Sequence, residues 1–241
     1  MNEHPTPDSI PEPKPGTHKS RVITKVLSPA LRLWLRSLTS EVSDLELQIS
    51  GSDRQIISGY IPRVFISASR AVYQGLHLTR VRLEAENIRI NIGSILRGKP
   101  LRLIEKVPVV GELLLYEKDL NASLSSPLLS NALTDLLVSL IPEYRSKSGD
   151  THWHQITIES ERVILLGTQS ETFKKTTVEI RFGIKLTSCH ELQLLNPQIL
   201  TDTESHLKED LNFDLGPEVN IQELTLTTGK VFALGGLTVI P

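Results

Sequence analysis

The sequence predicts an α+β fold in which long antiparallel strands are combined with three or four helices. The first observation is an alternating ribbon at residues 75–93, where apolar and polar side chains take turns. Such alternation predicts a strand with one buried and one solvent-facing side. The second observation is a change to helical spacing at residues 118–141. Because the strands do not alternate one for one with helices, the order of elements favours α+β over a parallel α/β sheet.

Composition limits the possible functions. The chain has 241 residues, of which 39% are hydrophobic and 5% aromatic, so its core is expected to consist of Leu, Ile and Val. A formal net charge of -2 argues against a dedicated nucleic-acid-binding protein. Residues 1–106 hold 16 basic and 10 acidic side chains, and residues 107–241 hold 10 and 18. This asymmetry is typical of a surface that meets an anionic partner such as lipid headgroups, and chance together with solvated faces explains it equally well.

The N-terminal part divides into a tail and a helix. Residues 1–18 contain five prolines and almost nothing apolar, which predicts a disordered tail. Residues 19–39 are expected to hold a basic amphipathic helix, most clearly at 20–38, which Pro29 should kink or divide. A narrow basic stripe beside a broad apolar face is typical of an interfacial membrane helix and also of a helix packed on a sheet. The expected membrane-contact residues are Arg21, Lys25, Arg32, Trp34 and Arg36.

The next part of the chain is predicted to be mostly extended. The alternating segments lie at residues 42–49, 56–69, 75–93 and 107–115. Turns are expected at 51–53 and at 98–100, and the stretch 67–74 also fits a helical turn.

Helices and further strands follow. Two consecutive helices are expected within 118–141, because Pro127 suits a first helical turn and Pro142 ends the second helix. A polar loop is expected at 143–152 and a short helix at 203–211. Strands are predicted at residues 153–159, 161–168 and 173–188, and a final hairpin at 219–240 with its turn at Thr228-Gly229. The pair Gly235-Gly236 indicates a bulge or tight bend.

No motif in the chain predicts catalysis. The segment 93–99 has the spacing of a phosphate-binding loop, but Pro100 stands where a hydroxyl should hold magnesium, which favours a simple turn. His152 and His154 could share one side of a strand, but zinc needs a third ligand and usually a fourth. We therefore expect no enzyme activity, no catalytic residue, no metal site and no cofactor.

Location is read from what the sequence lacks. Cys189 is the only cysteine, which fits a reducing compartment. We find no run of 18 apolar residues and no apolar N-terminal segment of the kind that a signal peptide carries. The expectation is a cytoplasmic protein that is peripheral to a membrane and has neither a signal peptide nor a transmembrane helix.

Three stretches carry a family resemblance. They are the start of the ribbon at 75–83, the acidic helix start at 117–121 with the distinctive Asp119–Leu124, and the closing segment through 214–216, 224–226 and 235–239. In this order, residues 40–241 resemble a single domain of the LmeA-like phospholipid-binding family of bacteria. The resemblance implies an elongated, strongly curved sheet wrapped around helices, similar to tubular lipid-binding proteins, with a tunnel-like groove for acyl chains and no catalytic residue. The chain departs from secreted members of the family because no export signal is visible.

The expected groove is lined by aliphatic side chains of the predicted strands and helices. They are Leu78, Val81, Leu83, Ile88, Ile90, Leu124, Leu133, Leu137, Val178, Ile180, Leu224 and Leu226. Such a groove needs no specific polar contact, because each buried methylene contributes about 0.8 kcal/mol. The resulting hypothesis is non-enzymatic binding or transfer of phospholipid or another acyl lipid at an anionic membrane surface. The alternative is a scaffold protein with a fully packed interior that binds another protein through a strand edge or the 20–38 helix.

Overall fold

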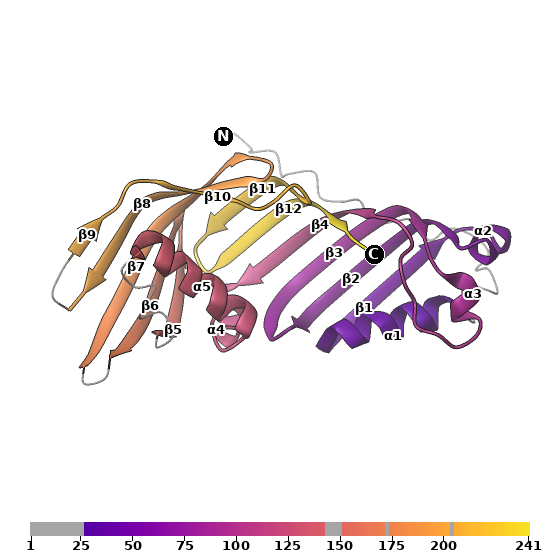
Figure 1. Ribbon diagram of the computed structural model, residues 1–241, viewed down its shortest axis with the longest axis horizontal. Helices are drawn as coiled ribbons and strands as arrows, with labels where there is room; N and C mark the ends of the chain where they lie inside the picture. The colour runs from indigo at the N-terminus through magenta and orange to yellow at the C-terminus, as the bar shows by residue number, and fades with distance from the viewer. Residues whose placement is uncertain (1–26, 143–150, 172–173, 203–204) are drawn as a thin grey trace, which may run out of the picture.

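The computed structural model describes residues 27–142, 151–171, 174–202 and 205–241. Within these ranges the chain forms two antiparallel sheets and five helices (Figure 1). The two sheets follow one another along the long axis of the molecule, which gives it an elongated shape (Figure 1). This arrangement agrees with the predicted α+β class built on long antiparallel strands.

The first sheet joins the N-terminal strands to the C-terminal hairpin, in the order β1-β2-β3-β4-β12-β11. Its strands are β1 (Thr39–Ser50), β2 (Tyr60–Tyr73), β3 (Leu76–Arg89), β4 (Val107–Tyr116), β11 (Val219–Thr227) and β12 (Lys230–Val239). Every neighbouring pair is antiparallel. The predicted C-terminal hairpin is confirmed, because Thr227 pairs with Lys230 across the turn.

The second sheet has the order β10-β8-β7-β6-β5, and β9 pairs with β8 beside this path. Its strands are β5 (Thr151–Glu159), β6 (Arg162–Glu171), β7 (Lys174–Ser188), β8 (Glu191–Thr201), β9 (Ser205–Leu207) and β10 (Leu211–Asp214). The three predicted strands between residues 153 and 188 are therefore confirmed as β5, β6 and β7.

The helices lie in two groups (Figure 1). They are α1 (Ser28–Leu38), α2 (Asp53–Ile57), α3 (Ile92–Ile95), α4 (Glu117–Ala122) and α5 (Pro127–Leu140). Helices α1, α2 and α3 lie at the end of the first sheet that contains β1, whereas α4 and α5 lie beside the second sheet (Figure 1). Pro127 occupies the first turn of α5 and Ile141 caps its end, so the two consecutive helices within 118–141 are confirmed.

Each helix group covers its own hydrophobic core. The first core, which we call core 1, is formed by α5 and the second sheet, with Leu137, Val178, Ile180 and Ile199 fully buried. The second, core 2, is formed by α1, α3 and the β1 end of the first sheet, with Leu27 and Ile56 fully buried. Core 2 therefore lies on the first sheet, whereas core 1 lies on the second sheet and reaches the first sheet through Leu226 of β11.

Pro29 lies in the first turn of the described helix, and the kink or division expected at this residue stays a prediction. Helix α1 starts at Ser28, and its proline lies in the first turn, where a missing backbone N–H costs nothing. The rest of the predicted 20–38 helix, residues 20–26, lies outside the described residues, as does the predicted tail at 1–18. Most of the predicted loop at 143–152 also lies outside them, and its last two residues, Thr151 and His152, belong to β5.

The short helix expected at 203–211 is wrong. Ser205–Leu207 forms β9, and Leu211–Asp214 forms β10. Both strands pair with β8, a strand that was not expected from the sequence. The charged, helix-compatible stretch is extended here because pairing with a neighbouring strand outweighs local propensity.

Three smaller expectations need correction. The stretch 67–74 is mostly strand and contains no helical turn. Ser52 is not a simple turn residue, because it caps α2 in a reciprocal capping box with Gln55. The 75–93 ribbon ends as a strand at Arg89, and Ile92 already belongs to α3.

The expected bulge occurs opposite the glycine pair. The register of β11 shifts between Ile221 and Glu223, where β12 presents Gly235 and Leu234. A Cβ atom built on Gly235 would lie 2.4 Å from the carbonyl oxygen of Asn220. Only glycine therefore allows the two strands to approach this closely.

Helix α4 joins the two sheets through its side chains. On one side, Glu117 accepts a hydrogen bond from the Ile158 amide, and Asn121 bonds both backbone groups of Ile156 at the edge strand β5. On the other side, Asp119 accepts from the Thr79 hydroxyl and Ser123 accepts from the His77 amide, both on β3. Residues four apart lie on the same side of a helix, so the acidic stretch behind the family resemblance connects the sheets.

Candidate functional site

One face of the first sheet is apolar across its central strands. Val81 pairs with Leu113, Leu113 with Ala233, and Ala233 with Leu224, so these side chains form a row across β3, β4, β12 and β11. A parallel row lies two residues further along β3, β4 and β12 and consists of Leu83, Gly111 and Gly235. On β11 this row continues to Ile221, which is three residues from Leu224 because the register shifts between Ile221 and Glu223. Residues two apart in a regular strand share a face, so both rows point the same way on β3, β4 and β12.

We call these eight residues the apolar strip. All of them are partly exposed. None belongs to core 1 or core 2, although their neighbours on the same face do. Ala85 and Val109 pack against core 2 on one side, and Val231 packs against core 1 on the other. The strip is therefore the part of this face that lies between the two cores.

Two paired glycines shape the middle of the strip. Gly111 and Gly235 are directly opposite each other on β4 and β12. A Cβ atom built on Gly111 would lie 2.6 Å from Cδ2 of Leu83, so the Leu83 side chain leans over the bare backbone. Any larger residue at position 111 would displace the Leu83 side chain and make the surface of the strip bulge outward at this point.

The opposite face of β3 is charged and forms ion pairs with both neighbouring strands. Arg63 of β2 lies 3.0 Å from Glu84 and also pairs with Glu86, while Arg82 lies 3.5 Å from the buried Glu112 of β4. The hydrogen bond from Arg63 to Glu86, helped by the charges of both glutamates, raises the pKa of the arginine. This charged face agrees with the alternation of the ribbon, whereas on β4 and β12 the same face also carries Leu114, Phe232 and Leu234.

The structure divides the residues that were expected to line a groove. Val81, Leu83 and Leu224 lie in the strip. Leu78 belongs to neither core, and it is separated from Val81 by the point where β2 contains the left-handed Arg70. The others contribute to the packed cores: Ile88 and Ile90 to core 2, and Leu124, Leu133, Leu137, Val178, Ile180 and Leu226 to core 1. The strip also contains residues that sequence reasoning missed, although the regular alternation of β4 and β12 carried the signal.

Helix α1 presents a mixed basic and apolar surface. Arg32 and Arg36 are exposed, and Leu33 between them is 71% exposed. Trp34 is partly buried and packs against core 2, so only part of its side chain is exposed. Arg21 and Lys25 lie outside the described residues.

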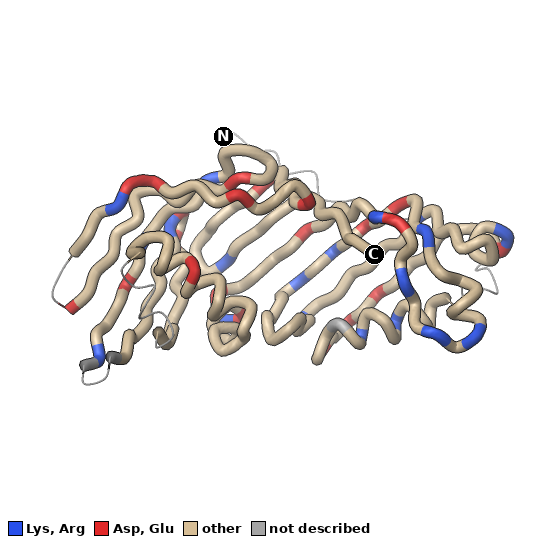
Figure 2. The backbone as a smooth tube through the Cα atoms, viewed as in Figure 1, with Lys and Arg blue, Asp and Glu red and all other residues tan. Residues whose placement is uncertain are grey.

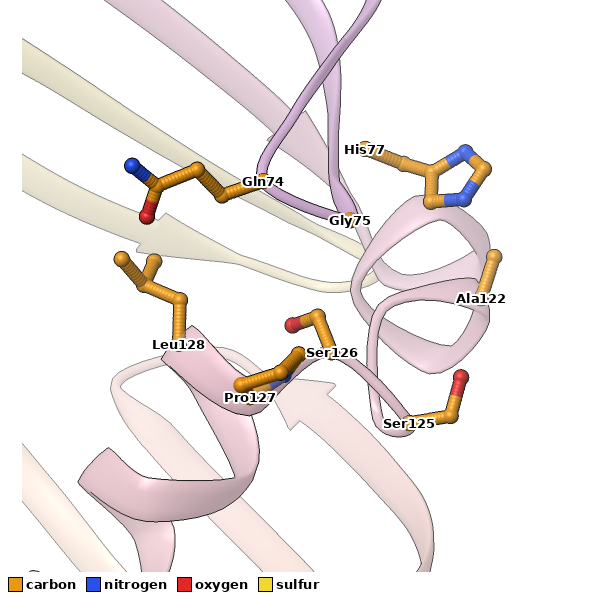
Figure 3. Close-up of a pocket in the computed structure, with 8 residues that line it drawn as sticks. All are labelled: Gln74, Gly75, His77, Ala122, Ser125, Ser126, Pro127 and Leu128. Carbon is orange, nitrogen blue, oxygen red and sulfur yellow. The ribbon is translucent and has the colours of Figure 1, made fainter. Parts of the chain in front are cut away.

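One pocket lies away from the strip. It has a volume of about 530 Å³ and is lined by Gln74, Gly75, His77, Ala122, Ser125, Ser126, Pro127 and Leu128. Figure 3 shows Gln74 and Leu128 at one end of this pocket and His77 and Ala122 at the other, with Ser126 between them. Its largely polar lining is unlike the aliphatic surface that acyl chains require. A second pocket, of about 280 Å³, lies beside α3 and contains Lys99 and Arg102.

The histidine pair gives no metal site in the part of the chain that the structure describes. The rings of His152 and His154 stack with their centroids 4.9 Å apart. Across the described ranges, no three or more His, Cys, Asp or Glu side chains are grouped to hold a metal ion. Among the same residues, no helix combines the length and the apolar character that crossing a membrane requires.

Comparison with known proteins places the chain among phospholipid-binding proteins, since one of their family models matches residues 19–235. The chain belongs to the LmeA-like phospholipid-binding family. The resemblance found in the sequence is thereby confirmed. No curated protein and no solved structure matches the chain.

Proposed function

We propose that this protein binds phospholipid or another acyl lipid at a membrane surface, without catalysing a reaction, and that the acyl chains lie along the apolar strip. The observation that carries the proposal is the position of the strip, which is an aliphatic surface of the first sheet that lies outside both packed cores. Membership of a phospholipid-binding family supports acyl lipid as the ligand. In this proposal the first sheet curves around the bound chains and forms the walls of a groove.

The size of the strip is sufficient for useful affinity. Four neighbouring strands span about 14 Å at the usual spacing of about 4.8 Å. Burying roughly ten methylene groups contributes about 8 kcal/mol before the costs of association and ordering are subtracted. Aliphatic contact alone can therefore hold a lipid here, and the polar headgroup can remain in water.

The exposed side of α1 is suited to an anionic bilayer. Arg32 and Arg36 supply positive charge, and the exposed Leu33 can enter the headgroup region between them. In the proposal Arg21 and Lys25 extend this basic surface, and the exposed part of Trp34 lies at its border. The protein is then peripheral to the membrane, and lipid enters the strip from the bilayer.

The two faces of β4 provide a matched test. Leu113 belongs to the strip, whereas Leu114 is also part-buried but lies on the opposite face, where it pairs with Phe232. Leu113→Asn puts an amide against the acyl chain, where it cannot be solvated, at a cost of about 1–3 kcal/mol. We expect Leu113→Asn to weaken lipid binding about tenfold or more and Leu114→Asn to leave it unchanged. The measurement is native mass spectrometry of each protein after incubation with a phospholipid extract.

Thermal unfolding checks that both variants fold. Equal lipid occupancy in the two folded variants would contradict binding along the strip. If the wild-type protein takes up no lipid at any ratio, the scaffold alternative becomes the better account of the fold.

A further inference from the structure

A polar pocket lies at the α3 end of the molecule, away from the apolar strip. It has a volume of about 280 Å³ and is lined by Asn91, Ser94, Lys99, Pro100 and Arg102. A water molecule takes up about 30 Å³ in the liquid, so this space can hold a phosphate group with several waters. The pocket falls within the segment whose sequence resembles a phosphate-binding loop but lacks the magnesium-binding hydroxyl.

Backbone hydrogen bonds hold the walls of this pocket in place. The side chain of Asn91 donates to the Pro100 carbonyl at 3.0 Å and accepts from the Arg102 amide at 2.7 Å. The Asn91 amide also donates to the Arg102 carbonyl at 3.2 Å, and the Lys99 amide donates to the Ser94 carbonyl at 3.0 Å. Asn91 is therefore a positioning residue, and the loop needs little ordering when a ligand binds.

Three side chains around the pocket are available as donors. Within the described part of the chain, Ser94, Lys99 and Arg102 have no side-chain hydrogen bond or ion pair. Lys99 and Arg102 are exposed, so the pocket carries two cations and one hydroxyl without an anionic partner. Guanidinium and ammonium groups with a hydroxyl are the donors that recognise phosphate oxygens.

The surface around the pocket combines charge with exposed aliphatic side chains. Residues 89–106 include five basic residues and one acidic residue. Leu96 and Ile104 are 56% and 58% exposed. Figure 2 shows Lys and Arg gathered in the loop after α3 and along α1, which both lie at this end of the molecule. The two helices contribute to the same core 2.

We propose that this pocket binds the phosphate group of an anionic phospholipid at the bilayer surface, with Leu96 and Ile104 entering the headgroup region beside it. The proposal rests on the proposed function and deepens it, because it assigns the end of the molecule that docks on the membrane. Lys99 and Arg102 bind the phosphate oxygens, and the Ser94 hydroxyl donates to a third oxygen. Docking at this end leaves the apolar strip free to receive acyl chains.

The experiment compares two double variants with equal loss of charge. Lys99→Gln/Arg102→Gln removes the pocket cations, while Arg162→Gln/Lys185→Gln removes two exposed cations of the second sheet. Flotation with vesicles of phosphatidylcholine containing phosphatidylglycerol measures membrane binding. We expect the pocket variant to bind about 10- to 30-fold more weakly than wild type, and the control variant to stay within about twofold.

Two further measurements separate this proposal from the proposed function. Native mass spectrometry with phospholipid should show equal acyl-lipid occupancy in wild type and the pocket variant, since the strip is intact. Titration with inorganic phosphate, followed by NMR, tests whether the pocket takes the free ion instead.

Equal flotation of the two folded double variants overturns the pocket proposal, while loss of lipid in Leu113→Asn still supports the strip. Tight binding of inorganic phosphate that does not depend on vesicles also overturns membrane docking, because it makes free phosphate the ligand. Loss of lipid occupancy in the pocket variant would count against separate sites.

Discussion

Asn121 shows how a single side chain can hold two sheets together. Its amide donates to the Ile156 carbonyl and accepts from the Ile156 amide, each at 2.8 Å, so it satisfies the free edge of β5 as a neighbouring strand would. It also donates to the Glu117 carbonyl in its own helix. The residue forms part of a glycosylation sequon, but its role in this structure is to fix α4 against the second sheet.

Replacing Asn121 should destabilise the protein. In Asn121→Ala, the two backbone groups of Ile156 lose their partner, and each unsatisfied buried group costs about 1–3 kcal/mol. We expect the free energy of unfolding to fall by about 2 kcal/mol or more, measured by urea denaturation. Asn220→Ala is the control, since Asn220 is exposed and its side chain makes no hydrogen bond within the described residues. An equal fall in the free energy of unfolding of both variants would contradict the role of Asn121 in holding α4 against the second sheet.

The sequence predicted the faces of individual residues wherever the strands are regular. The apolar series of β3 changes phase between Ala85 and Ile88, and the structure explains this by the left-handed conformation of Asn87, with φ 56. A second left-handed residue, Arg70 with φ 50, lies on β2 between the partners of Leu78 and Arg80, so an irregular step also separates Leu78 from Val81. Alternation alone could not predict either irregularity, because it contains no information on backbone dihedral angles.

At the scale of elements, α1 has a buried side and an exposed side. Leu31 is 6% exposed and belongs to core 2, whereas Leu33 is 71% exposed between two arginines. The same helix can therefore complete a core and present a surface to a bilayer. The sequence left open whether this helix packs on a sheet or contacts a membrane. The structure shows that one side of the helix packs against core 2.

This division of α1 gives a paired prediction. Leu33→Asn should weaken flotation with anionic vesicles several-fold without changing the melting temperature, because an exposed leucine contributes little to folding. Leu31→Asn should lower the melting temperature markedly, since it buries an amide in core 2. Calorimetry and vesicle flotation on both variants provide the measurements. If Leu33→Asn floats like the wild type, the exposed side of α1 takes no part in membrane contact.

The elements that sequence reasoning missed are those defined by distant partners. Strands β9 and β10 exist because β8 pairs with them, and β8 itself lacked a clear alternating pattern. Helix α2, in contrast, had a readable signal in the capping pair Ser52 and Gln55. The apolar strip needed the registers of four strands, which no local pattern supplies.

For the whole molecule, charge and apolar surface are separated along the long axis. The basic segments lie around α1 and α3 at one end, whereas acidic and basic segments both occur on the second sheet (Figure 2). The acidic C-terminal half of the sequence is divided between the two sheets, because β4, β11 and β12 belong to the first sheet. A molecule of this kind is oriented by the field of an anionic surface before any contact forms.

Salt should separate docking from lipid uptake. The Debye length shortens from about 10 Å at 0.1 M salt to about 3 Å at 1 M, so vesicle binding through exposed cations should fall steeply. Uptake of a phospholipid already in solution should change little, because the strip carries no charge. Flotation and native mass spectrometry after incubation across this range measure the two steps. Docking that does not depend on salt would contradict an electrostatic approach.

The central strands have a further consequence for how the fold behaves when it is empty. Strands β3, β4 and β12 each pair with a neighbouring strand on both sides. One of their faces includes the apolar strip, which belongs to neither core 1 nor core 2. A lipid tail bound on the strip would bury this apolar surface as a third hydrophobic core. It would thereby couple the unfolding of core 1 and core 2. The loaded protein should then resist heat better than the empty one, because a ligand that binds only the native state adds its binding free energy to the stability.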